Sequence, residues 1–82
     1  MDRIEKWRHL EAALTQLVGS MSAQLNERDR LLLDDFIDNR EYGVALEWLH
    51  SSIVENDLSL SADQKNEIRR LAELMGIDLA QP

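Results

Sequence analysis

The sequence predicts an all-α fold, a single small domain of about four short helices. Apolar residues recur at spacings of three and four along most of the chain, which is the period of an amphipathic helix. No alternation of apolar and polar residues lasts long enough for a strand, and short polar stretches separate the periodic segments. We therefore expect helices near residues 3–18, 27–38, 40–56 and 62–75, within one domain over residues 1–82.

The first segment forms an amphipathic helix whose apolar side we expect to face the core. That side carries Ile4, Trp7, Leu10, Leu14, Leu17 and Val18. Gly19 and the serines after it predict the end of the helix and a loop, although Met21 keeps the apolar register and could extend it.

The second segment begins after Asn26, a predicted N-cap, with Glu27 and Asp29 in the first turn, where the helix dipole favours negative charge. A helical wheel places its core face on Leu32, Leu33, Phe36 and Ile37. The opposite side gathers Glu27, Asp34, Asp35 and Asp38 around Leu31. Two interpretations of Leu31 stay open: an interface anchor within a charged rim, or a residue packed under the first or fourth helix.

The third segment is the most strongly patterned, with Tyr42, Ala45, Leu46, Leu49 and Ile53 along one core stripe. Its remaining side carries Glu41, Val44, Trp48, Ser51, Ser52 and Glu55. Trp48 is then either a second layer of the core or an exposed hot spot flanked by acids. Gly43 costs about 1 kcal/mol of helix propensity relative to alanine, which favours a close approach there by another helix or by a partner.

The fourth segment has clear signals at both of its ends. Ser61 and Gln64 fit a capping box, in which each side chain accepts a hydrogen bond from the backbone N–H of the other residue. The buried stripe is Ile68, Leu71, Ala72 and Met75. Gly76 stands where a left-handed residue ends a helix, and we expect Ile77 to pack back onto the last turn.

The sequence offers no catalytic constellation, so we expect no enzyme. Its histidines are His9, placed opposite the apolar stripe and expected in solvent, and His50, which has Glu47 one turn before it. No nucleophile or second acid accompanies that pair, and the chain has no cysteine. We expect no cofactor.

The same residues argue against a bound metal. Gly43 falls at the sixth position of a would-be calcium loop that starts at Asp38, but the third, fifth and twelfth positions, which need oxygen ligands, hold Arg40, Tyr42 and Leu49. Asp34, Asp35 and Asp38 are close enough on a helix to share a cation, yet a solvated acidic face explains them better.

The charge is concentrated in the middle of the chain. The formal net charge is −7, and residues 27–57 contribute −6 of it. This argues against nucleic acid as a partner, because a phosphate backbone requires clustered Lys and Arg, and it favours a basic protein surface. A face that only keeps a small protein soluble is the alternative. No signal peptide or membrane span is recognisable, so we expect a cytoplasmic protein with no membrane partner.

Two segments resemble a known family. They are REYGVALEWL, residues 40–49, and SLSADQKNEIRRLAELMGID, residues 59–78. Together they resemble the MafI-type immunity proteins of bacterial polymorphic toxin and contact-dependent growth inhibition systems, in which an acidic residue, an aromatic and a glycine precede an "ALE" helix and the last helix closes with "MG". The positions that carry the resemblance are Glu41, Tyr42, Gly43, Ala45, Leu46, Glu47, Leu71, Met75 and Gly76.

The resemblance covers about half of the chain and implies a function in the cytoplasm. Such a protein binds a cognate toxin domain, often a nuclease, and blocks it. We expect a one-to-one complex with a basic toxin, a ribonuclease being the favoured class, because an acidic helical face can occupy a basic active-site region. The predicted partner-binding residues are Leu31, Asp34, Asp35, Asp38, Glu41, Trp48 and Glu55. The alternative is a small homodimerising adaptor without a toxin.

Overall fold

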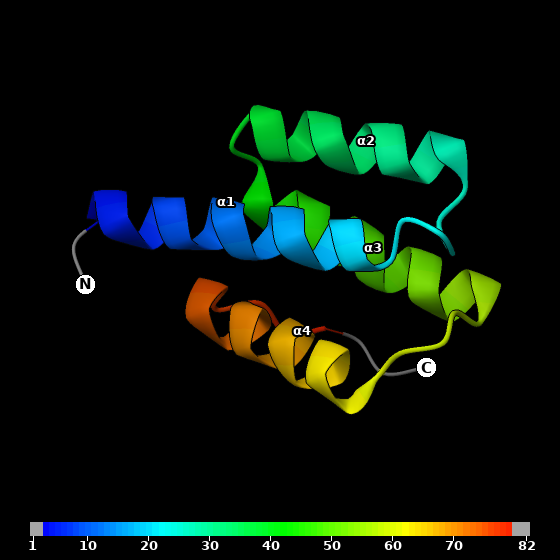
Figure 1. Ribbon diagram of the computed structural model, residues 1–82. Helices are drawn as coiled ribbons and strands as arrows, with labels where there is room; N and C mark the ends of the chain where they lie inside the picture. The colour runs from blue at the N-terminus through cyan, green and yellow to red at the C-terminus, as the bar shows by residue number, and fades with distance from the viewer. Residues whose placement is uncertain (1–2, 80–82) are drawn as a thin grey trace.

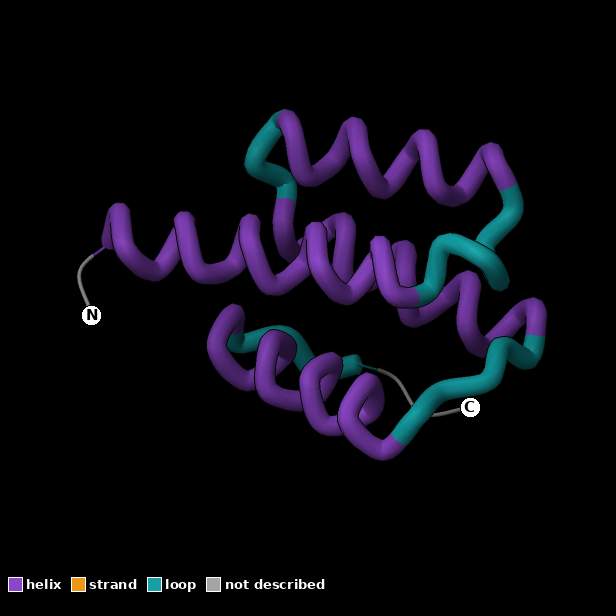
Figure 2. Tube along the Cα trace, in the orientation of Figure 1, coloured by secondary structure: helices purple, strands orange, loops and turns teal. Residues whose placement is uncertain are grey.

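The computed structural model describes residues 3–79 and confirms an all-α domain (Figure 1). Its helices are α1 (Arg3–Ser20), α2 (Glu27–Asp38), α3 (Tyr42–Asn56) and α4 (Ala62–Met75). Helices and loops account for this whole range, and no strand occurs in it (Figure 2). Residues 1–2 and 80–82 of the predicted domain lie outside the described residues.

The helices form a small bundle in which each helix runs opposite to the one before it (Figure 1). α1 and α3 lie next to each other in the middle, with α2 on one side of them and α4 on the other. Both middle helices contact both outer helices, whereas α2 and α4 do not contact each other among residues 3–79. α3 packs most extensively against α2. The sides of α2 and α4 that point away from α1 and α3 are therefore open to partners.

The core confirms most of the predicted apolar stripes. The largest side chains that are fully buried come from every helix and from the first connection, and they are Leu14, Met21, Leu33, Leu46, Leu49 and Leu71. The complete α3 stripe is buried. On α2, Leu33 and Ile37 are buried while Leu32 and Phe36 are half-buried, and Met75 of α4 is also half-buried.

The α1 stripe reaches the core only from Leu10 onward, so the prediction for its first two members was wrong. Ile4 is 61% exposed and Trp7 is 39% exposed, whereas Leu10 is 3% exposed. The reason is helix length. α1 has 18 residues, more than any other helix of the bundle, and its first turns extend past the ends of the helices that cover it (Figure 1).

The predicted caps are confirmed in detail. The Asn26 side chain accepts a hydrogen bond from the backbone N–H of Asp29 at 2.8 Å, and Ser61 and Gln64 form both bonds of the capping box. Gly76 has a φ of 66°, and the N–H of Ile77 donates to the carbonyl of Ala72 at 2.9 Å, which closes α4 as expected.

Two helix boundaries differ from the prediction. α1 continues through Gly19 to Ser20 and is followed by the fully buried Met21, so the apolar register extends the helix despite the glycine. α3 begins at Tyr42 instead of residue 40. The turn before it uses Arg40, whose φ is 61°, and the N–H of Glu41 donates back to the carbonyl of Phe36 at 2.8 Å.

The two glycines at helix ends predict opposite responses to the same substitution. Gly76→Ala should lower the free energy of unfolding by about 1 kcal/mol, because a Cβ disfavours the left-handed backbone, although no other atom would touch it. Gly19→Ala should raise it by about 0.5–1 kcal/mol, because Gly19 lies within a helix and also has free space around it. Urea unfolding of both variants checks this, and shifts of equal sign would contradict it.

Candidate functional site

The outer side of α2 presents one apolar residue among acidic ones. Leu31 is 55% exposed, and Glu27, Asp34, Asp35 and Asp38 are exposed around it. We call these five residues the α2 face. Leu31 also lines a shallow depression together with Glu27, Arg28, Leu32 and Asp35. Leu31 is therefore not packed under α1 or α4, and its role as an interface anchor stays a prediction.

The carboxylates of the α2 face are unpaired within the described part of the chain. Over residues 3–79, none of the four makes an ion pair or a side-chain hydrogen bond. Arg28 and Arg30 lie on the same helix, exposed toward the two edges of the face, and form no ion pair with these acids. The face therefore carries negative charge that is available to an external cation.

The remaining predicted site residues do not gather at this face. Glu55 is exposed on α3, one turn beyond Ser52, beside the side of α3 that α2 covers. Glu41 lines a different groove, between the beginnings of α1 and α3, together with Arg3 and Lys6. The predicted set is thus divided between two regions of the surface, and only Glu55 borders the α2 face.

Trp48 belongs to the packing between α2 and α3, which was one of its two predicted roles. Its side chain is half-buried, its ring centroid lies 5.9 Å from that of Phe36, and the planes are inclined by 60°. Its indole Nε1–H donates to Oδ1 of Asp29 at 3.2 Å. Trp48 therefore supports the position of α2 from behind and does not project as an anchor.

Asp29 is the residue that sequence reasoning missed. It stands in the first turn of α2 but is only 9% exposed, and Ser52, which lies outside the predicted core stripe of α3, is only 4% exposed. The Ser52 hydroxyl donates to Oδ2 of Asp29 at 3.0 Å, so both carboxylate oxygens accept a hydrogen bond from α3. The helical register indicates this burial, because Asp29 stands four residues before Leu33 and seven before Phe36, on the inner side of the helix.

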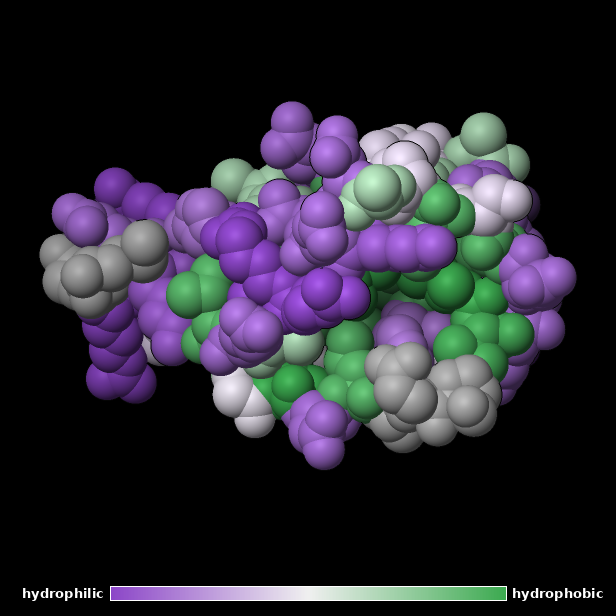
Figure 3. Space-filling view, turned by 90° about the horizontal axis from the view of Figure 1, so that it is seen from below, coloured by the Kyte–Doolittle hydropathy of each residue, from purple (hydrophilic) through white to green (hydrophobic). Residues whose placement is uncertain are grey.

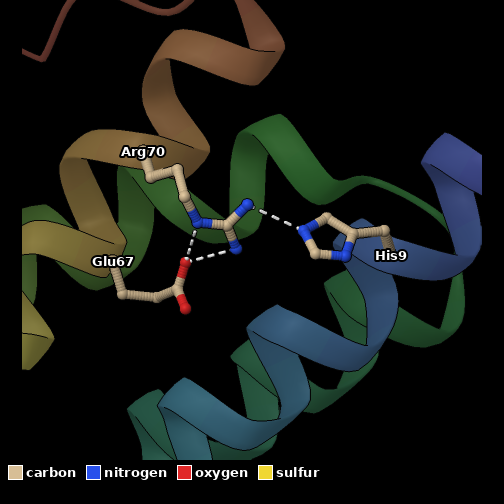
Figure 4. Close-up of polar contacts among 3 residues, drawn as sticks. All are labelled: His9, Glu67 and Arg70. Carbon is tan, nitrogen blue, oxygen red and sulfur yellow. Dashed lines mark hydrogen bonds and ion pairs between the residues drawn. The ribbon is translucent and has the colours of Figure 1, made fainter. Parts of the chain in front are cut away.

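The histidines occupy separate positions and do not form a catalytic arrangement. His9 is half-buried against α4, so its prediction as a solvated residue was wrong. Nη1 of Arg70 donates to Nε2 of His9 at 2.8 Å, and Nε of Arg70 donates to Oε1 of Glu67 at 2.7 Å (Figure 4). Because a guanidinium can only donate, Nε2 of His9 is the acceptor in this contact. The contact joins α1 to α4.

His50 and Glu47, which stand one turn apart on α3, face different grooves. His50 lines a groove of about 420 Å³ between α3, α4 and the segment after α4, whereas Glu47 lines the groove near Trp7. Apolar side chains are exposed next to α4 on the face that Figure 3 views, with polar groups between them. No group of three or more His, Asp or Glu side chains within residues 3–79 is placed to hold a metal ion.

Gly43 has the close neighbour that its position in the first turn of α3 predicted. A Cβ built there would lie 3.2 Å from Cδ1 of Ile77, the residue that follows the glycine at the end of α4. The close approach is made within the chain, by a side chain. Gly43 thus lets the end of α4 pack onto the beginning of α3.

Comparison of the chain with protein-family models, with curated proteins and with solved structures finds no match. Among the described residues, no helix has the length and apolar character needed to cross a membrane. The functional argument therefore rests on the surface itself.

The buried carboxylate gives a test of how α2 is fixed. Asp29→Ala should lower the free energy of unfolding by about 1–3 kcal/mol, because the Trp48 and Ser52 donors lose their acceptor. Asp34→Ala is the matched control on the same helix and should change it by no more than about 0.5 kcal/mol. Equal effects in chemical denaturation would mean that the Asp29 contacts do not hold α2 in place.

Tyr42 predicts how stability depends on alkaline pH. Burial raises the pKa of its phenol above the ordinary 10.0, and the negative charge of Glu11 adds to this, while Arg40 opposes it. Below pH 10 both the folded and the unfolded chain hold the proton, and above it the unfolded chain loses the proton first. The contribution of Tyr42 to the free energy of unfolding is therefore complete below pH 10 and is lost as the pH rises through the raised pKa.

The measurement is the stability of the protein and of Tyr42→Phe across this range. From about pH 8 to pH 11 the protein should lose more stability than the variant, which has no phenolic proton. Lysine and arginine residues are common to both chains, so their titration cancels in the difference. Parallel curves would refute the raised pKa.

Proposed function

We propose that this protein is an immunity protein that binds a basic toxin domain, a nuclease, one to one and blocks it with the α2 face. The observation that carries the proposal is the exposed Leu31 surrounded by Glu27, Asp34, Asp35 and Asp38, whose carboxylates have no partner within residues 3–79. It acts in the cytoplasm and by binding alone.

The electrostatics of the α2 face suit a nuclease. An active site that binds a phosphate backbone is lined by Lys and Arg, and a row of carboxylates on one helix offers negative charges in place of the phosphates. The net −6 of residues 27–57 speeds encounter with such a cleft and repels acidic proteins. Charge sets the association rate and the choice of partner.

The apolar contact and the fixed position of α2 slow dissociation. Leu31, at the centre of the face, would enter an apolar pocket beside the basic cleft, with the carboxylates as its rim. Because Asp29 binds both Trp48 and Ser52, α2 is ordered before the toxin arrives, and little conformational entropy is lost on binding. Glu55 extends the rim onto α3, and Glu41 and Trp48 take no part.

The resemblance to MafI-type proteins supports the class of function and not the choice of surface. Its residues lie at the start of α3 and in α4, and α2 contributes none of them. The assignment of the α2 face therefore depends on exposure and charge.

The proposal is tested by reversing charge on the α2 face. The triple variant Asp34→Lys, Asp35→Lys, Asp38→Lys should bind the toxic domain encoded next to this protein's own gene at least tenfold more weakly and should fail to protect cells that express it. Affinity of the unmodified protein should fall as salt rises. Binding is measured by calorimetry and protection by colony counts.

A second triple variant separates local charge from total charge. Asp63→Lys, Glu73→Lys, Asp78→Lys changes the net charge equally, uses exposed acids of α4 and the segment after it, and should bind normally. If both triples bind alike, the α2 face is not the interface. If the unmodified protein neither binds nor protects, the immunity function itself is wrong.

A further inference from the structure

A cleft of about 410 Å³ opens where the turn between α2 and α3 descends beside the first half of α1 (Figure 1). Four of its lining residues share one side of α1, at spacings of three and four, and two come from the turn and the start of α3. The lining residues are Ile4, Trp7, Arg8, Glu11, Arg40 and Tyr42. Two guanidinium groups, two aromatic rings and one carboxylate therefore meet in a volume that is typical of a small-molecule site.

Tyr42 is the most buried residue of this cleft, and its hydroxyl has no partner. The side chain is only 7% exposed, yet within residues 3–79 its hydroxyl makes no hydrogen bond. Burial and then the charge of Glu11 raise the pKa of the phenol, and Arg40 lowers it, so both charged groups lie near the hydroxyl. A protonated phenol that faces a cleft without an acceptor indicates a ligand that supplies one.

The charged side chains of the cleft are also unpaired. In the part of the chain that the structure describes, Arg8, Glu11 and Arg40 form no ion pair and no side-chain hydrogen bond. The two guanidinium groups and the phenol all offer donors, and the acceptor that suits such donors best is a carboxylate or a phosphate. With two arginines and one glutamate, the lining carries a net charge of +1 in a chain of net charge −7. A single negative charge therefore complements the cleft best.

Arg40 occupies a backbone position at which glycine is the most stable residue. Its φ is 61°, and its N–H donates to the carbonyl of Ile37 at 3.0 Å. The next N–H, from Glu41, donates to the carbonyl of Phe36 at 2.8 Å, which completes a Schellman motif at the end of α2. Any side chain in this left-handed conformation costs stability. The chain keeps an arginine there, and its side chain lines the cleft, which indicates a task for the guanidinium.

We propose that this cleft binds a small aromatic carboxylate, a single negative charge joined to a planar ring. The carboxylate accepts hydrogen bonds from Arg8, Arg40 and the Tyr42 hydroxyl. The ring packs against Trp7, which is 39% exposed. The Arg3 guanidinium lies over the Trp7 ring but lines the neighbouring groove and not this cleft.

Glu11 sets the selectivity of the site. Its carboxylate repels a second negative charge, so a phosphate ester, whose charge near neutral pH is about −1.5 to −2, is disfavoured. The cleft shares no residue with the α2 face. The proposal therefore holds whether or not the proposed toxin binding is correct.

The ligand is tested by NMR titration of the full chain with phenylacetate at millimolar concentrations. The indole N–H signal of Trp7 and the amide signals of residues 39–42 should shift. The indole N–H of Trp48 is the internal control and should stay in place, because it is bound to Asp29 between α2 and α3. Phenylacetamide lacks the charge, acetate lacks the ring and phenyl phosphate carries the second charge, so each should bind about tenfold more weakly.

The donors are tested by removing them one at a time. Arg8→Gln should weaken the binding of phenylacetate by about tenfold, and Tyr42→Phe by about threefold or more. Arg69→Gln is the matched control for Arg8→Gln, because Arg69 is an exposed arginine that does not line the cleft, and it should bind normally. Glu11→Gln should bind phenyl phosphate more tightly than the unmodified protein does.

Arg40→Gly separates binding from stability. Glycine fits the left-handed backbone better, so this variant should unfold at the same or a higher urea concentration and yet bind phenylacetate about tenfold more weakly. Three results would overturn the proposal: phenylacetate that shifts no signal of the cleft, phenylacetamide that binds as tightly as phenylacetate, or Arg40→Gly that binds as tightly as the unmodified protein.

Discussion

The position of α2 depends on one buried carboxylate. Asp29 receives the indole N–H of Trp48 and the hydroxyl of Ser52, one on each oxygen, and all three side chains lie where α2 packs on α3. A buried carboxylate is costly unless it is fully hydrogen-bonded, so any rotation of α2 that breaks these contacts is penalised. Hydrophobic contacts at Leu33 and Ile37 tolerate small rotations, whereas two directed hydrogen bonds do not. The polar contact therefore fixes which side of α2 faces outward.

That orientation divides the acids of α2 into two roles. Asp29 is satisfied inside, while Glu27, Asp34, Asp35 and Asp38 remain in solvent without partners among residues 3–79. Like charges on successive turns repel one another, which weakens the helix by a few tenths of a kcal/mol for each close pair. Arg28 and Arg30 reduce the repulsion at the edges of the face but do not neutralise it. A surface that only kept the chain soluble would be served as well by mixed charges.

Local rules predicted the parts of the fold that depend on a few neighbouring residues. The Asn26 cap, the Ser61–Gln64 box and the Gly76 termination each need only one turn of helix, and all are as expected. Predictions from the sequence were wrong where the burial of a side chain depends on the length or the rotation of a neighbouring helix. Ile4 and Trp7 have the right period for a core, but none of the helices within residues 3–79 extends far enough to cover them. The roles of Ser52 and Trp48 depend on how α2 crosses α3, and the residue pattern of α3 alone does not determine this crossing.

The same reasoning explains why the start of α1 is informative. Burying a large apolar side chain contributes about 1.5–3 kcal/mol, and a domain of this size has a total stability of about 5–15 kcal/mol. Ile4 is 61% exposed, Val44 45% and Trp7 39%, so this chain of 82 residues realises only part of that contribution at these positions. The first turns of α1 extend past the helices that cover the rest of it, so this helix is longer than the core of the bundle uses.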